Sequence, residues 1–152
     1  MNKVVVVGTG KEEYAIPLRY VVSIEKLEGI IPIPQMPDYV TGIIEIRQQV
    51  IPIIDLEYIF YYRFLQMDEN SRLVIVQLEQ FMVGILVNEA KEIIEISPEK
   101  IKQIGFIKSP ATAYLIGVAS LTGSLVAIIN PEVLIGSLEG INVVLDELKS
   151  HF

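Results

Sequence analysis

A mainly all-β fold with a few short helices and one C-terminal helix is the architecture that this sequence predicts. Short apolar runs, about nine or ten in number, are separated by turn-forming residues at spacings of roughly 8 to 12, which is typical of barrels and sandwiches. The apolar residues make up 51% of the chain and are mostly Val, Ile and Leu, which favours strands. Only the C-terminal segment has the length and periodicity of a long helix.

The N-terminal third predicts two strands, at residues 4–8 and 13–16, joined by a glycine-containing turn. Pro17 ends the second strand because proline cannot donate a ladder hydrogen bond. Residues 19–27 are interpreted as a short helical turn that feeds a strand. Prolines 32, 34 and 37 make residues 30–37 an extended connection, since proline and the residue before it disfavour helix.

The centre of the chain predicts two pairs of strands separated by a short helix and a polar loop. Asp55 can cap that helix by accepting backbone N–H groups. The first pair spans 39–46 and 50–54, the helix 56–60, the loop 66–71, and the second pair 73–78 and 81–87.

The last third begins with a weakly alternating strand and ends in helices. A helical turn with Pro98 at its first position follows that strand. The expected elements are the strand 92–96, the turn 97–100, a hairpin of 114–119 and 125–129, a short helix 131–135 and a long helix 140–152.

Residues 109–131 carry no charged side chain, which leaves two interpretations. By length the segment could span a bilayer. Its polar and turn-forming residues, with Leu121, Thr122, Gly123 and Ser124 at the centre, favour a buried β-hairpin instead.

The formal net charge of −7 argues against nucleic acid or an anionic membrane surface as a partner, because both need a basic footprint. The chain contains no cysteine, which excludes disulfides, zinc–thiolate sites and thiol nucleophiles. The N-terminal run of four valines is too short for a signal-peptide core, so we expect a cytoplasmic protein.

No residues with the pattern of a catalytic, cofactor or metal site are found in the sequence. The single histidine, His151, is next to the C-terminus, a poor place for a rigid catalytic imidazole. Gly8-Thr9-Gly10 follows a strand, but Glu13 stands where the dinucleotide fingerprint needs its third glycine. We expect a plain hairpin turn there.

The aromatic segment 58–62 has two interpretations. Its rings can pack into the core with a half-buried rim, or they can form an exposed anchor for a partner protein, since tyrosine is frequent at interface hot spots. Arg63, directly after it, fits either interpretation.

Residues 14–56 resemble the signature region of the CheW-like family. Members show a Tyr-x-Ile/Leu strand, a valine-rich segment, a Pro-x-Tyr/Phe-Val/Ile-x-Gly-Val/Ile run, an Asn-Leu-Arg-Gly turn and a Pro-Ile/Val-Ile/Val-Asp-Leu strand. The corresponding residues here are Tyr14, Ile16, Val21, Pro37, Tyr39, Val40, Gly42, Ile43, Arg47, Pro52, Ile53, Ile54, Asp55 and Leu56. Residues 81–88, 116–118 and 121–123 resemble later family motifs more weakly.

The resemblance implies one CheW-like domain over residues 1–152, built of two intertwined small SH3-like β-barrels that share a core. It also implies a chemotaxis adaptor that is not an enzyme and needs no cofactor. Its partners would be the regulatory domain of the CheA histidine kinase and the cytoplasmic tip of a chemoreceptor, which binds a groove between the barrels.

The resemblance also suggests which residues meet each partner. The kinase-interface candidates are Val21, Ser23, Gly42 and Arg47. The receptor-groove candidates are Gly84, Val87, Asn88, Ala90 and Ile93. Packing is an equally good explanation for several of them, and a local salt bridge is the alternative for Arg47.

Three residues depart from the family pattern: Glu45 replaces its asparagine, Gln48 its turn glycine and Asn88 its aspartate. Since glycine permits a positive-φ turn, Gln48 predicts either another turn or backbone strain. These departures suggest a divergent member. The alternatives are therefore a scaffold for another kinase pathway and, from a different class, a small-ligand-binding β-barrel.

Overall fold

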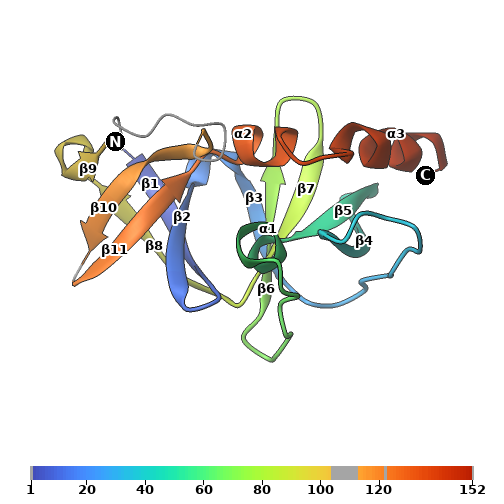
Figure 1. The fold of residues 1–152 in the computed structure, drawn as a ribbon, viewed down its shortest axis with the longest axis horizontal. Helices are drawn as coiled ribbons and strands as arrows, with labels where there is room; N and C mark the ends of the chain where they lie inside the picture. Colours follow the sequence, from blue (N-terminus) through green and yellow to red (C-terminus); the bar gives the residue numbers. More distant parts are fainter. Residues whose placement is uncertain (1, 104–112, 122, 152) are drawn as a thin grey trace.

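The computed structural model describes residues 2–103, 113–121 and 123–151, and its strands form two sheets (Figure 1). The first sheet has the strand order β8-β1-β2-β11-β10-β9. Its strands are β1 (Asn2–Thr9), β2 (Glu12–Pro17), β8 (Glu89–Ile96), β9 (Ile101–Lys102), β10 (Leu115–Leu121) and β11 (Ser124–Ile129). Strands β2 and β11 pair in parallel, and the other neighbours are antiparallel.

The second sheet has the order β3-β6-β7-β5-β4. Its strands are β3 (Val21–Lys26), β4 (Val40–Ile46), β5 (Gln49–Asp55), β6 (Arg72–Gln77) and β7 (Met82–Val87). Only β5 and β7 pair in parallel within it. This sheet is formed by one continuous stretch of chain that is inserted between β2 and β8 of the first sheet.

Helices are short and lie at the junction and along one end of the two sheets (Figure 1). The helix α1 follows β5 directly, and α2 and α3 follow β11. Their bounds are α1 (Leu56–Tyr61), α2 (Pro131–Gly136) and α3 (Ile141–His151), with 3-10 turns η1 (Leu18–Tyr20) and η2 (Pro98–Lys100). No helix in the described part of the chain is long and apolar enough to cross a membrane.

Three clusters of buried apolar side chains form the core. The largest joins both sheets to α2 and α3, with Val7, Ile54, Val83 and Ile129 each at 0% exposure. A second cluster fills the second sheet and a third fills the first. One shared core with a smaller core in each sheet is compatible with the predicted pair of barrels, and the mainly all-β prediction is confirmed.

The cap of α1 forms as the local sequence predicts, whereas Ser97, the expected cap of η2, makes no side-chain cap hydrogen bond. Asp55 accepts a hydrogen bond from Tyr58 N with Oδ1, at 3.1 Å, and one from Leu65 N with Oδ2, at 2.9 Å. The carboxyl group thereby caps the start of α1 and also fixes the segment that follows the helix. Burial raises the pKa of Asp55 above its usual value, although the backbone donors oppose this shift.

The turn between β4 and β5 confirms the strain that Gln48 predicts. Arg47 and Gln48 both have positive φ, 51° and 65°. Positive φ at both central residues of a two-residue hairpin loop is the signature of a type I′ turn, which glycine and asparagine adopt most readily. The type I′ turn is therefore formed by two residues that are less suited to it than glycine or asparagine.

Most predicted elements occur within three residues of their expected positions. The uncharged segment contains the hairpin β10–β11, as predicted, while residues 109–112 and Thr122 lie outside the described residues. Two elements differ. Strand β8 starts at Glu89, three residues early, and the two-residue strand β9 was not expected.

Candidate partner-binding surfaces

Three of the four kinase-interface candidates lie on the two edge strands of the second sheet, and the fourth lies in the turn after one of them. Val21 and Ser23 belong to β3, Gly42 to β4, and Arg47 to the turn after β4. Between these strands is a depression of about 640 Å³, which we call the edge groove. It is lined by Ile24, Glu25, Lys26, Glu28, Gly29, Ile31, Ile44, Glu45 and Ile46.

The edge groove combines exposed isoleucines with an acidic margin. Ile24 is 37% and Ile31 58% exposed, and because both line the same depression they form one small apolar patch. Glu25, Glu28 and Glu45 line the same depression, against a single lysine. The surface therefore suits a partner with an apolar patch and basic groups beside it.

Gly42 has a structural role at this groove. A Cβ atom at this position would lie 2.6 Å from the carbonyl oxygen of Ile31. That carbonyl accepts a hydrogen bond from Ile43 N at 2.8 Å, and Ile31 N donates to Ile43 O at 2.9 Å. Glycine thus lets the segment after β3 lie against β4 and form one wall of the groove.

Val21, Ser23 and Arg47 differ in what they present. The Ser23 hydroxyl is buried without a hydrogen-bond partner among the described residues, beside the irregular pairing of β3 with β6. Val21 is half-buried against the shared core. Arg47 is exposed at the turn and forms no ion pair with the described residues. The local salt bridge that was the alternative explanation for Arg47 is therefore not formed among them.

The receptor-groove candidates lie along the crossing from the second sheet to the first. Gly84 and Val87 are buried in β7, where they pack the core. Ala90 is half-buried and Ile93 is 56% exposed, both on the edge strand β8. Asn88 stands between β7 and β8, and its Oδ1 accepts a hydrogen bond from Gly10 N at 2.8 Å.

Asn88 lines a depression of about 910 Å³ between the β1–β2 turn and the chain after α1, which we call the junction groove. It is bounded by one segment from each sheet, as expected of a groove between two barrels. Phe64, 63% exposed, and Met67, 49% exposed, supply apolar surface within it. Asn88 is the one receptor-groove candidate among its lining residues.

An ion pair between a buried glutamate and a half-exposed arginine fixes one side of the junction groove. Arg63 Nε lies 2.6 Å from Glu57 Oε2, and the Glu57 side chain is only 10% exposed. The Arg63 guanidinium also lies 5.0 Å from the centre of the Tyr61 ring. Because the guanidinium both pairs with Glu57 and covers an aromatic face, this wall has a defined shape.

The aromatic segment contains both packed and exposed rings. Phe60 stacks on Tyr14 and Tyr114, with ring centres 4.6 and 5.4 Å apart, so this half is packing. The hydroxyl groups of Tyr61 and Tyr14 share a 2.5 Å hydrogen bond. Burial is the main cause that raises the pKa of Tyr14, and this hydrogen bond is the second cause. Tyr62, by contrast, is 80% exposed.

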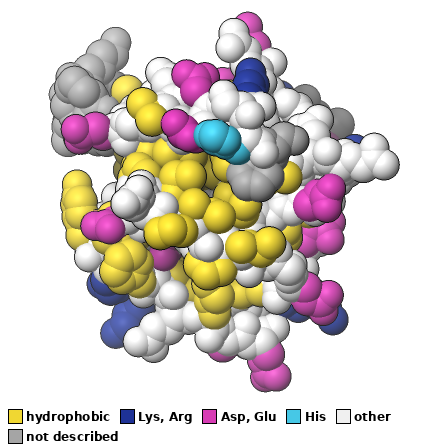
Figure 2. Space-filling view, turned by 90° about the vertical axis from the view of Figure 1, so that its right-hand side faces the viewer, with side chains coloured by type: hydrophobic (Ala, Val, Ile, Leu, Met, Phe, Trp, Pro, Cys, Tyr) yellow, Lys and Arg dark blue, Asp and Glu magenta, His cyan; other side chains and the backbone are white. Residues whose placement is uncertain are grey.

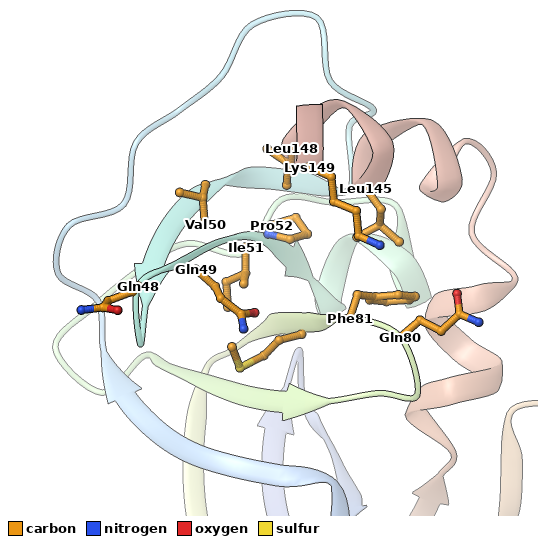
Figure 3. A pocket seen from close by; sticks show the side chains of 11 residues that line it. Gln48, Gln49, Val50, Ile51, Pro52, Gln80, Phe81, Leu145, Leu148 and Lys149 are labelled. Carbon is orange, nitrogen blue, oxygen red and sulfur yellow. The ribbon is translucent and has the colours of Figure 1, made fainter. Parts of the chain in front are cut away.

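A third depression, of about 380 Å³, lies between α3, β5 and the β6–β7 turn (Figure 3). Val50, Pro52, Phe81, Leu145 and Leu148 form its apolar walls, and glutamine side chains stand at its rim. Figure 2 shows apolar side chains gathered at the centre of this face of the molecule, with Asp and Glu side chains around them.

Sequence reasoning missed the residues that make these surfaces apolar. Ile24 and Ile31 belong to segments expected to be strand and connection, and Phe64 and Met67 border an expected polar loop. Their only sequence signal is a large apolar side chain next to prolines or charges. Exposure itself depends on the tertiary arrangement.

Comparison with known proteins places this chain in a family. The model of the CheW-like domain matches residues 3–139. The chemotaxis protein CheW of Klebsiella aerogenes is 30% identical over 143 residues, which cover 93% of this chain and 86% of that protein. The chemotaxis protein CheW of Bacillus subtilis is 30% identical over 101 residues, covering 66% and 65%.

A solved structure agrees with both the fold and the sequence match. The scaffolding protein TtCheW from Thermoanaerobacter tengcongensis superposes with a TM-score of 0.79 at 28% identity, covering 91% of this chain and 90% of that one. The match spans both sheets, and therefore both the edge groove and the junction groove. On these grounds the chain belongs to the CheW-like domain family.

Proposed function

We propose that this chain is a non-enzymatic chemotaxis scaffold that couples chemoreceptors to the CheA histidine kinase in the cytoplasm. The observation that carries the proposal is the family match over residues 3–139 together with the superposition on a scaffolding protein over 91% of the chain. Relatives of similar length carry the name chemotaxis protein. The chain acts as one domain, because the largest core cluster ties the two sheets together.

The edge groove is the proposed contact for the CheA regulatory domain. Its exposed Ile24 and Ile31 offer the apolar centre of an interface, and its glutamates offer a charged rim. Arg47, exposed beside Ile46, adds a guanidinium without a partner in the described chain. Gly42 contributes by letting the Ile31 segment lie against β4, without touching the kinase itself.

The junction groove is the proposed contact for the chemoreceptor tip. Phe64 and Met67 provide exposed apolar surface there. The Asn88 side chain accepts a hydrogen bond from Gly10 N, which fixes the position of the β1–β2 turn at this groove. Ile93 extends apolar surface along β8. Gly84 and Val87 support this region from within the core. Two separate surfaces on one rigid body allow both partners to bind together, which is how a scaffold produces multivalent assembly.

Calorimetry with the regulatory domain of a CheA kinase from the same genome tests the kinase contact. We expect micromolar or tighter binding that Arg47→Ala weakens by about tenfold, which corresponds to roughly 1.4 kcal/mol. Lys100→Ala, which removes one positive charge from the exposed η2 turn beside the first sheet, is the matched control and leaves binding unchanged.

The outcomes separate the alternatives. A folded protein that does not bind CheA would contradict the coupling role and favour a scaffold for another kinase pathway. Equal weakening by Arg47→Ala and Lys100→Ala would show that overall charge, and not the edge groove, governs the affinity.

A further inference from the structure

A pocket that neither proposed contact uses lies between α1 and the turn that joins α2 to α3. It has a volume of about 550 Å³, and we call it the tyrosine pocket. Tyr39, Tyr58 and Tyr62 give it three aromatic rings, and Asp38 and Glu139 give it two exposed carboxyl groups. Its remaining lining residues are Pro37, Ile59, Ser137 and Leu138.

Two of the rings are held in place before any partner binds. Tyr39 is 8% exposed, and its hydroxyl donates to the carbonyl oxygen of Glu139 at 2.7 Å. This bond ties the α2–α3 turn to the start of β4. Tyr58 donates to Asp38 Oδ2 at 3.2 Å and stacks on Phe64 with ring centres 5.0 Å apart. A preformed pocket loses little conformational entropy on binding.

The third ring, that of Tyr62, belongs to a residue with an unfavourable backbone conformation. Tyr62 ends α1 in the left-handed region, with φ of 57°, where glycine or asparagine is usual. Its side chain is 80% exposed and meets the Tyr58 ring edge-on, with centres 5.9 Å apart. The fold gains little burial from this ring. Strain of this kind is concentrated at functional positions, which calls for a role outside folding.

The charges of the pocket indicate what it binds. Asp38 and Glu139 form no ion pair with any lysine, arginine or histidine of the described residues. Aromatic faces next to carboxylates favour a cation, and a planar guanidinium both stacks on tyrosine and pairs with a carboxylate. We propose that the tyrosine pocket binds an arginine side chain presented by a partner protein.

This inference does not depend on which proteins the two grooves bind. The pocket shares no lining residue with the edge groove or the junction groove. An arginine seated here therefore adds a third contact, and failure of the CheA or receptor assignment leaves it intact.

Titration of the full chain with N-acetyl-arginine amide, followed by ¹H–¹⁵N NMR, tests the proposal. N-acetyl-citrulline amide, which has the same shape without the charge, is the control ligand. We expect chemical-shift changes that saturate at millimolar ligand concentrations and are confined to residues 38–39, 58–62 and 137–139. The citrulline ligand binds at least about fivefold more weakly, because it lacks the cation–π and carboxylate attraction.

Two variants locate the site. Asp38→Asn keeps the shape of the side chain and weakens arginine binding, while citrulline binding stays the same. Tyr62→Gly weakens binding while the thermal midpoint stays the same or rises, because glycine adopts the left-handed conformation without strain. Equal binding of both ligands, shifts spread over unrelated acidic surface, or the absence of saturable shifts would each overturn the proposal.

Discussion

The side-chain oxygen of Asn88 accepts a 2.8 Å hydrogen bond from the backbone N–H of Gly10. Gly10 belongs to the β1–β2 turn of the first sheet, and Asn88 is the residue at which the chain leaves the second. Asn88 N also donates to the Gly8 carbonyl oxygen at 2.8 Å. One residue thus ties the turn to the crossing point and sets the floor of the junction groove.

Asn88→Ala is expected to lower the free energy of unfolding by about 1–2 kcal/mol, because Gly10 N–H loses its partner. Asn88→Asp restores a charge-assisted acceptor and keeps most of the stability. Urea denaturation of both variants measures the difference. Equal losses in the two would show that the hydrogen bond is unimportant.

Gln48→Gly is expected to stabilise the fold by about 0.5–1 kcal/mol, because glycine adopts positive φ without a steric penalty. Gln49→Gly, one residue later in the extended strand β5, is the matched control and destabilises by a similar amount. Both are measured by denaturation at neutral pH. A loss of stability in Gln48→Gly would contradict the strained turn.

Gly42→Ala is expected to cost about 1–3 kcal/mol, since the new methyl group would overlap the Ile31 carbonyl oxygen. Hydrogen exchange at the Ile31 and Ile43 amides should accelerate as the two segments separate. Gly136→Ala, at a position with open space around it, is the control without this effect. Unchanged exchange in Gly42→Ala would refute the close approach.

Stability is expected to fall at alkaline pH. Burial raises the pKa values of Tyr14, Tyr39 and Tyr114 above the ordinary value near 10. A group whose pKa is higher in the folded than in the unfolded state stabilises the fold fully at pH values below its unfolded-state pKa. This stabilisation is lost as the pH rises through the folded-state pKa. Tyr14→Phe should therefore show a shallower loss above pH about 10, measured by denaturation with tyrosinate absorbance. An unchanged slope would contradict the account.

The two hairpins of the second sheet, β4–β5 and β6–β7, follow from short-range information. The β4–β5 hairpin is set by two apolar runs around a two-residue loop, and Asp55 marks the start of α1 through its capping chemistry. These features need only neighbours in sequence, so the sequence predicts them. Gln48, in place of the family's glycine, predicts either another turn or backbone strain, and its positive φ shows the second.

Features that depend on distant residues could not be predicted in this way. Strand β9 has only Ile101 and Lys102 and exists through its pairing with β10, so no local pattern reveals it. Ile24 and Ile31 give no sign in sequence that they stay exposed. The tyrosine pocket brings together residues about a hundred positions apart, as Tyr39 and Glu139 show.

The most direct test of the coupling role is sedimentation of the protein with both a CheA regulatory domain and a chemoreceptor tip fragment. We expect one complex that contains all three chains, in which Arg47→Ala lowers the amount of bound kinase fragment and leaves the amount of bound receptor fragment unchanged. Mutual displacement of the two fragments, or failure of either to sediment with the protein, would contradict a scaffold with two separate surfaces.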